Sequence, residues 1–445
     1  MNIDSFIARR HELARRMQHG VAVIATAPEK LRNRDTHYGF RPDSYFHHLT
    51  GFDEPEAVLV VIAGASPRSV LFCRERDELR EIWDGYRMGP ERAKAQLGVD
   101  EAFPIGQLDT KLAELIANQQ QLYYMTGSDV AWDARMMSVL NAVRAQARAG
   151  VSAPAILNDV SVFLDDMRLI KDADEIAIMQ RAADISAEAH KRAMRTTQPG
   201  RYEYEIEAEL LYEFRRQGSQ APAYGSIVAS GAGACVLHYV SNNRQMQDGE
   251  LLLIDAGCEL DGYASDITRT FPVNGIFSPA QRDVYQLVLD AQSAAIATLR
   301  PGAKFIDDHD VAVRVLTQGL IDLGLLSDTL DQAIESGSYK RYYMHRTGHW
   351  LGRDVHDAGS YRGRPKADSF ETEEWCTLEA GMVLTVEPGL YIRPADDIPK
   401  HFWNIGVRIE DDALITPDGC RILSQAAPKT ISDIENLMAE TRHAN

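Results

Sequence analysis

Two stretches with the same pattern decide the fold of the C-terminal half of this 445-residue chain: Gly249–Gly257, GELLLIDAG, and Gly381–Gly389, GMVLTVEPG. In each, a glycine precedes an apolar run that ends in a carboxylate, and another glycine follows two residues later. A short apolar run bounded by such residues is typical of a buried strand. A carboxylate at its end is costly to bury unless it is paired or bound to a metal. The stretches therefore predict two related α/β halves that bring Asp255 and Glu387 to strand ends.

Helical patterns around these strands repeat in the same way. One long amphipathic helix is predicted after Lys171, ending near Gln198–Gly200. Another begins with Ser278 as N-cap, Pro279 in the first turn and Gln281 in the capping-box position. A second amphipathic helix follows each of them, and strand-like segments follow both pairs. This repeat supports the interpretation of two related halves.

The N-terminal part has a different organisation. Apolar strand-like runs at 21–25, 57–62, 69–73 and 121–125 alternate with helical stretches such as 90–96 and 110–118. This alternation predicts a small α/β domain over residues 1–167, followed by the second domain over residues 168–445. The segment Trp83–Tyr86 is expected to form a loop.

Composition narrows the class of protein. The chain is 45% hydrophobic and 25% charged, as soluble globular proteins are, and its net charge is −18. This charge argues against nucleic acid or an anionic membrane surface as the main partner. Five scattered cysteines and the lack of an apolar stretch after the N-terminal arginines predict reduced thiols, no secretory signal and a cytoplasmic location.

Five residues are candidate metal ligands: Asp255, Asp266, His349, Glu387 and Glu410. Any one of these acids alone is more often a cap or a surface residue, so the hypothesis depends on the set. Four carboxylates and one imidazole make an oxygen-rich group of donors that suits Mn²⁺ or another first-row divalent ion. Two divalent cations would cancel the four negative charges.

Several motifs around these residues resemble the pita-bread metallopeptidases. They are Asp255–Gly257 followed by Asp266, His345–Gly352, Val355–Asp357, Thr385–Gly389 and Arg408–Glu410. Within that fold family the chain is similar to aminopeptidase P, with prolidase as a near relative. The segment from Arg32 to Phe52 also resembles the N-terminal domain of the bacterial aminopeptidases P. The resemblance implies a small α/β domain followed by a pita-bread catalytic domain.

The resemblance also implies the chemistry. It implies two divalent ions, usually Mn²⁺, with Asp266 and Glu410 bridging, Asp255 on one ion, and His349 and Glu387 on the other. A shared hydroxide would attack the bond before proline in peptides with proline in the second position. Glu387 would carry a proton to the leaving nitrogen.

Other residues receive roles through the same resemblance. His356 is the expected donor to the developing oxyanion, and His238 and His345 are expected to position the substrate. Tyr224 and Arg408 are further substrate-binding candidates, although a salt bridge within its own strand is the plain alternative for Arg408. The matching tryptophan in aminopeptidase P reaches a neighbouring subunit's active site, so Trp83 implies a homo-oligomer, a dimer or a tetramer.

Alternative functions remain at this point. A prolidase would share the metal ligands and accept only dipeptides. Methionine aminopeptidase would leave the N-terminal domain unexplained, and a non-catalytic pita-bread binding protein would have lost metal ligands. The chain departs from the family pattern at Arg353, where an aliphatic residue is usual. A basic residue beside the site is a candidate for tuning specificity.

Overall fold

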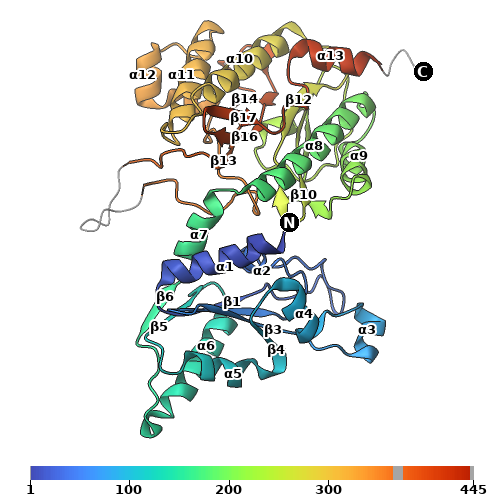
Figure 1. Cartoon of the computed structure of the whole chain (residues 1–445). Coiled ribbons are helices and arrows are strands. Elements are labelled where there is room, and N and C mark those ends of the chain that lie inside the picture. Colours follow the sequence, from blue (N-terminus) through green and yellow to red (C-terminus); the bar gives the residue numbers. More distant parts are fainter. Residues whose placement is uncertain (1, 364–373, 441–445) are drawn as a thin grey trace. The chain divides into compact units, whose positions relative to one another are not determined.

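The computed structural model describes residues 2–363 and 374–440. The chain divides into two compact units, Met1–Arg168 and Leu169–Asn445, and each is described by itself (Figure 1). Both units combine helices with sheets, which confirms the predicted α/β character.

The first unit is built on one six-stranded sheet with the order β4-β3-β2-β1-β5-β6. Its strands are β1 (Gly20–Ala25), β2 (Val58–Ala63), β3 (Arg68–Cys73), β4 (Glu101–Pro104), β5 (Gln121–Tyr124) and β6 (Ile156–Asp159). The β1–β2 and β2–β3 pairs are antiparallel, whereas β3–β4, β1–β5 and β5–β6 are parallel. The four predicted strands are therefore confirmed, and they lie within a mixed sheet.

Helices cover both faces of this sheet. One face packs against α1 (Ile3–Met17), α2 (Ser44–Thr50), α4 (Gly89–Leu97) and α7 (Ser161–Leu169). The other packs against α5 (Leu108–Ile116) and α6 (Val130–Arg144). Alternate residues of one strand serve the two faces, so Ala22 and Ile24 belong to the first core and Val21 and Val23 to the second.

Trp83 lies in a short helix rather than in a loop. Helix α3 (Glu78–Asp84) begins because the side chain of Asp77 accepts hydrogen bonds from the backbone N–H groups of Leu79 and Arg80. The expectation of a loop was wrong at Trp83 and Asp84, because an aspartate N-cap outweighs a weak helical pattern. None of the α3 residues is buried, and the Trp83 side chain is 86% exposed.

The second unit contains the two predicted helix pairs (Figure 1). Helices α8 (Ala173–Thr196) and α9 (Glu203–Arg216) form the first pair, and α10 (Pro279–Ile296) and α11 (Asp307–Asp322) form the second. Ser278 and Gln281 make the predicted capping box at the start of α10. Helices α12 (Leu330–Ser336) and α13 (Ile431–Glu440) complete the helices of the described residues.

Short antiparallel strands form the centre of the second unit. They are β7 (Ala221–Pro222), β8 (Ile227–Ser230), β9 (Leu251–Asp255), β10 (Cys258–Leu260), β11 (Tyr263–Ala264), β12 (Thr268–Pro272), β13 (Val383–Val386), β14 (Gly389–Ile392), β15 (Ile405–Arg408), β16 (Asp411–Thr416) and β17 (Gly419–Ile422). The sheet β12-β9-β8 belongs to the first half and β13-β16-β17 to the second. Both predicted strands before an acid, β9 and β13, are present.

A large apolar core joins the two halves of the second unit. Residues from α8, α9, α10 and α11 pack with the strands in one cluster that includes Ile185, Phe214, Tyr285 and Leu316. The helices thus cover the sheets from outside and leave the strand ends free to carry polar side chains. Among the described residues, no helix combines the length and apolar character needed to cross a membrane.

A buried ionic cluster fixes the junction of β12 and β16. The guanidinium of Arg269 and the carboxylate of Asp411 are both fully buried and lie 2.7 Å apart. Lys429 donates to the same carboxylate at 2.6 Å, and Arg269 also donates to the backbone carbonyl of Glu410. Burial by itself would raise the pKa of Asp411, but the neighbouring charges of Arg269 and Lys429 lower it to about 2.

Asp308, in the first turn of α11, is a buried carboxyl of the opposite kind. One oxygen accepts a 2.6 Å hydrogen bond from the backbone N–H of His309, and the other has no partner among the described residues. Burial, followed by the charges of Asp307 and Asp310, raises the pKa of Asp308 to about 7. Between about pH 4 and pH 7 the folded protein therefore holds a proton that the unfolded chain has released. Stability falls as the pH rises through this window.

Asp308→Asn should remove this titration. The free energy of unfolding of the variant, relative to the wild type, should rise between pH 5 and pH 8 by up to about 3 kcal/mol, because only the wild type must ionise a buried carboxyl. Thermal unfolding of both proteins across this range measures the difference. Asp322→Asn, at the other end of α11, is the control. Parallel pH profiles for Asp308→Asn and the wild type would contradict the assignment.

Candidate active site

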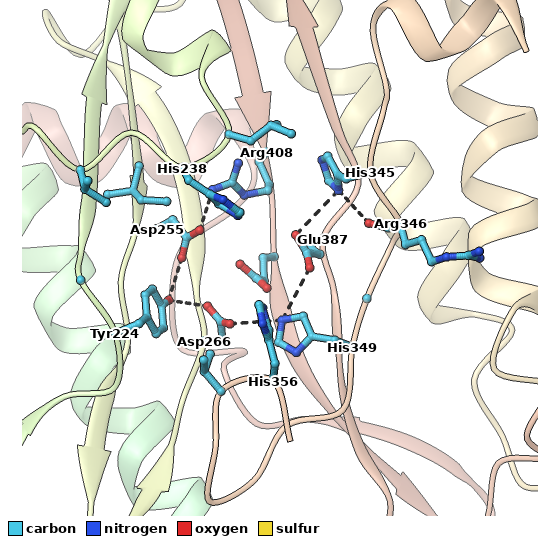
Figure 2. Close-up of a pocket in the computed structure, with 17 residues that line it drawn as sticks. Tyr224, His238, Asp255, Asp266, His345, Arg346, His349, His356, Glu387 and Arg408 are labelled. Atoms are coloured by element: carbon cyan, nitrogen blue, oxygen red, sulfur yellow. Dashed lines mark hydrogen bonds and ion pairs between the residues drawn. The ribbon is translucent and has the colours of Figure 1, made fainter. Parts of the chain in front are cut away.

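A cavity of about 410 Å³ in the second unit gathers the residues that the sequence singled out there (Figure 2). Its lining includes the five candidate metal ligands, Asp255, Asp266, His349, Glu387 and Glu410, and also His238, His345, His356, Tyr224 and Arg408. Trp83 belongs to the other unit. Residues more than 180 positions apart along the chain thus meet in one pocket.

The four acids come from strand ends or from short connections between strands. Asp255 is the last residue of β9, and Glu387 directly follows β13. Asp266 lies between β11 and β12. Glu410 lies between β15 and β16, where its backbone N–H donates to the carbonyl of Thr268. Strand ends converge here because each half contributes its own sheet.

His349 is held beside Glu387 by pairing of its segment with β13. The N–H of Thr385 donates to the carbonyl of His349, and the N–H of Glu387 donates to the carbonyl of Thr347. The approach is so close that a Cβ on Gly348 would lie 2.0 Å from the carbonyl oxygen of Thr385. Glycine before the histidine is thus a steric requirement of the site.

A second glycine permits the approach of Asp255 to Asp266. A Cβ on Gly257 would lie 1.7 Å from the backbone carbonyl oxygen of Ser265. The chain turns back on itself between Gly257 and Ser265 and brings Asp266 beside the end of β9. The glycine two residues after the strand-end acid therefore serves this crossing.

Asp266, His349 and Glu410 form the tightest group, with one potential ligand atom from each lying within 4.8 Å of the others. The Nε2 atom of His349 is 3.5 Å from Asp266 and 3.7 Å from Glu387. Its Nδ1 atom lies 2.9 Å from the carbonyl oxygen of Trp350, which can only accept. Nδ1 therefore carries a proton, and Nε2 is directed at the carboxylates, as in histidines that bind metals.

Burial and mutual repulsion disfavour the ionised carboxyls. The pKa of Glu387 is raised to about 7, mainly by burial and also by the charges of Asp266 and Asp255. Burial and the neighbouring acids raise the pKa of Glu410 far above its usual range. Burial lowers the pKa of His349, but Asp266 and Glu387 outweigh this effect and raise it to about 9. The site therefore favours positive charge.

Arg408 neutralises part of the negative charge of these carboxylates. It is buried, and its guanidinium lies 2.6 Å from a carboxylate oxygen of Asp255. It also donates to the hydroxyls of Thr268 at 3.2 Å and Tyr391 at 3.0 Å. The ion pair joins β15 to β9, so a salt bridge within its own strand is the wrong interpretation. All of this places Arg408 in the floor of the pocket.

His345 is held in one tautomer by the same network. Its Nδ1 atom lies 2.7 Å from the carbonyl oxygen of Arg346 and therefore carries a proton. Burial, and then the charge of Arg408, lower its pKa to about 3, so the ring is neutral and Nε2 accepts from the Tyr391 hydroxyl at 2.8 Å. Nδ1 also faces Glu387 at 3.9 Å (Figure 2).

The Tyr224 hydroxyl lies between Asp255 and Asp266. It is 2.7 Å from Asp255 and also hydrogen-bonded to Asp266. One hydroxyl proton cannot serve two ionised carboxylates at once, so this arrangement requires an additional proton or a cation nearby. Burial, and then the charges of these two acids and Glu410, raise the pKa of Tyr224 well above its usual range.

The remaining two histidines lie at the open side of the pocket, and both are exposed. The ring of His356 meets the ring of His349 edge-on at 4.3 Å. Burial of part of the ring, and then His349 and His238, lower the pKa of His356. A largely neutral His356 retains one N–H that can donate to a substrate oxygen.

Arg353 does not reach the cavity. It is buried, and its guanidinium lies over the ring of Tyr263 at 4.3 Å from the centre. The hydroxyl of Tyr263 in turn donates to Glu175, at the start of α8. The departure from the family pattern at this position is thus explained by packing beside the site.

Three residues of the site were missed from the sequence: Tyr391, Thr268 and Arg346. Tyr391 stands in the apolar strand β14 and looks like a core residue, which it also is at 1% exposure. Thr268 donates to Glu410 at 2.7 Å, and Arg346 lines the pocket beside His345.

Comparisons with known families agree with this geometry. Residues 177–417 match metallopeptidase family M24, and residues 6–124 match the aminopeptidase P N-terminal domain. The first match covers more than half of the chain and contains all five candidate ligands. The chain therefore belongs to metallopeptidase family M24. The N-terminal match adds that its domain arrangement is that of aminopeptidase P, with a pita-bread catalytic domain.

Individual relatives extend this finding over the full length. The Xaa-Pro aminopeptidase of Haemophilus influenzae is 46% identical over 98% of this chain and 97% of its own length. The structure of Pseudomonas aeruginosa aminopeptidase PepP has a TM-score of 0.96 at 48% identity, covering 100% of this chain and 99% of that one. Zinc-substituted aminopeptidase P of Escherichia coli with product has a TM-score of 0.95 at 42% identity, with 99% of both chains covered.

The donor set fits divalent cations. Carboxylate oxygens and one imidazole are the ligands that first-row divalent ions accept. The raised pKa values of Glu387 and Glu410 and the shared hydroxyl of Tyr224 are the signs of negative charge that a cation would relieve. Membership of a metallopeptidase family agrees with this conclusion.

Asp266→Ala should therefore abolish stoichiometric binding of divalent metal, because Asp266 belongs to the tightest group of ligand atoms. His238→Ala is the matched control, since His238 lines the same pocket outside that group, and it should keep its metal. Elemental analysis of the two purified variants, dialysed identically, measures the difference. A full complement of metal in Asp266→Ala would contradict this assignment.

Proposed function

We propose that this chain is a metal-dependent aminopeptidase that releases the N-terminal residue from peptides with proline in the second position. The observation that carries the proposal is the meeting of Asp255, Asp266, His349, Glu387 and Glu410 in one pocket of a chain with an aminopeptidase P N-terminal domain. The relatives named Xaa-Pro aminopeptidase match the chain over almost its whole length. A non-catalytic binding role would not require this ligand set.

The ligand assignment supports two divalent ions, for which Mn²⁺ is our choice. Asp255, Asp266, His349, Glu387 and Glu410 would hold them. Such ions supply a water of lowered pKa and polarise the scissile carbonyl. An oxygen-rich set of four carboxylates favours a hard ion such as Mn²⁺ over a softer one.

Glu387 is the proposed proton carrier. Its carboxylate can accept a proton at the site and return it to the leaving nitrogen, as a general acid–base group does. Its carboxylate faces His349 at 3.7 Å and His345 at 3.9 Å, so it is oriented from two sides. The proton is needed because a prolyl nitrogen leaves poorly unless it is protonated as the bond breaks.

Other residues of the pocket, three histidines together with Arg408 and Tyr224, receive supporting roles in this proposal. His356 donates to the developing oxyanion, for which its exposed ring beside His349 is suitably placed. His238 and the neutral His345 line the pocket that receives the proline. Arg408 and Tyr224 hold Asp255 and thereby shape the end that receives the substrate.

Glu387→Gln should lower kcat by roughly 10²–10⁴, with a much smaller change in KM, because the amide keeps the shape and one coordinating oxygen but carries no proton. Steady-state kinetics on an Xaa-Pro-Yaa peptide, with metal content measured in parallel, tests this role. Normal kcat in a variant that retains its metal would remove Glu387 from proton transfer.

The second candidate function is that of a prolidase. A dipeptidase must recognise the free carboxylate of the proline and exclude any chain beyond it. An aminopeptidase P must leave that end of the pocket open. The match to the aminopeptidase P N-terminal domain favours the open type.

Peptide length distinguishes the two functions. Xaa-Pro-Yaa and longer peptides should be cleaved at least as well as Xaa-Pro dipeptides, with release of the first residue alone, because the leaving chain needs an open exit. Mass spectrometry of the products from a metal-loaded preparation measures this. Hydrolysis of dipeptides with Xaa-Pro-Yaa left intact would establish the prolidase instead.

The proposal also covers the domain bounds, the oligomeric state and the cellular location of the chain. We infer that residues 1–167 form the N-terminal domain of the aminopeptidase P type and residues 168–445 the catalytic domain. A homo-oligomer is supported by the exposure of Leu79, Ile82, Trp83 and Tyr86 together on and beside α3, since aromatic anchors are frequent at interfaces. Five cysteines without a disulfide among them suit a cytoplasmic location.

A further inference from the structure

Arg346 lines the pocket but has no role in the proposed reaction. It lines the cavity next to His345, and its side chain is exposed. Figure 2 shows it on the far side of His345 from Asp255 and Asp266, pointing away from the carboxylates. It therefore stands at the rim, whereas the metal-binding group forms the floor.

Arg346 forms no ion pair with any described residue. The only other arginine among the described lining residues, Arg408, is buried and bound to Asp255. Arg346 instead lies with its guanidinium 4.8 Å from the ring centre of Trp375. Such a contact orients the planar group and leaves its edge N–H donors available.

The geometry of an exopeptidase decides which part of a substrate reaches this rim. When the scissile carbonyl lies at Asp266, His349 and Glu410, one residue lies upstream of it. All residues after the scissile bond belong to the leaving peptide. Because His345 is proposed to line the pocket that receives the proline, a group that extends past His345 to Arg346 belongs to the chain after the proline.

The surrounding charge explains why a cation matters there. Four carboxylates line the pocket, and the whole chain carries a net charge of −18. A negatively charged leaving peptide is repelled by this field. A free guanidinium at the rim opposes the repulsion locally and can bind a carboxylate with two parallel hydrogen bonds.

We propose that Arg346 is a specificity residue that binds a carboxylate on the residue following the proline. The proposal rests on the proposed Xaa-Pro aminopeptidase function and adds a preference within its substrates. Two sources share this chemistry, an acidic side chain at the third position and the terminal carboxylate of a tripeptide. Trp375 acts as the platform that positions the guanidinium.

The test compares kcat/KM within two pairs of peptides. Ala-Pro-Glu-amide against Ala-Pro-Gln-amide isolates the side chain, and Ala-Pro-Ala against Ala-Pro-Ala-amide isolates the terminal carboxylate. The wild type should prefer the charged member of at least one pair by about threefold to tenfold, the range of an exposed but oriented ion pair. The preference should shrink in about 0.5 M NaCl, because exposed charges are screened.

Arg346→Gln should bring the preferred ratio close to one, and Arg346→Lys should keep part of it. The control is Arg362→Gln. Arg362 is also exposed and lies 3.8 Å from the centre of the same Trp375 ring, but it does not line the pocket. This variant should keep the wild-type ratio.

Several outcomes would overturn the proposal. They are a wild-type ratio of one in both pairs, a ratio that survives in Arg346→Gln, and an equal fall for both members of a pair, which would indicate a merely structural role. Failure to cleave any of the four peptides would instead contradict the proposed function, so the two hypotheses fail in distinguishable ways.

Discussion

Repulsion among four buried or half-buried carboxylates is the constraint on which the rest of this structure depends. Asp255, Asp266, Glu387 and Glu410 share one pocket, and burial makes the ionised forms of Glu387 and Glu410 costly. Removing that cost requires positive charge at fixed positions. The protein provides part of it through Arg408 and His349, and the remainder defines the need for divalent cations.

The fold brings these charges together through its backbone. Strands from both halves end at the pocket, and two glycines allow the segments to cross almost in contact. Behind the acids, the paired Arg269 and Asp411 hold β12 against β16 and fix the carbonyl of Glu410. Rigid strand ends suit a metal site because ligand positions must hold without the ion as well as with it.

Much of this was predictable from the sequence, and the exceptions have physical reasons. An acid at the end of an apolar strand is visible locally, so Asp255 and Glu387 could be found, as could the capping box of α10. Tyr391 could not, because an aromatic residue in an apolar strand looks like core and only the fold brings its hydroxyl to Arg408. The short helix that contains Trp83 depends on one cap, which a loop-like composition concealed.

Two arginines are among the described residues that line the pocket, and burial gives the same side chain a different use in each. Arg408 is surrounded by low-dielectric protein, where its attraction to Asp255 is strong and its loss would leave Asp255 without its ion pair. It is therefore part of the structure of the site. Arg346 stands in solvent, where water and salt weaken any single contact to a modest energy. A charge of that strength is too weak to organise a site, but it suffices to make one substrate preferable to another.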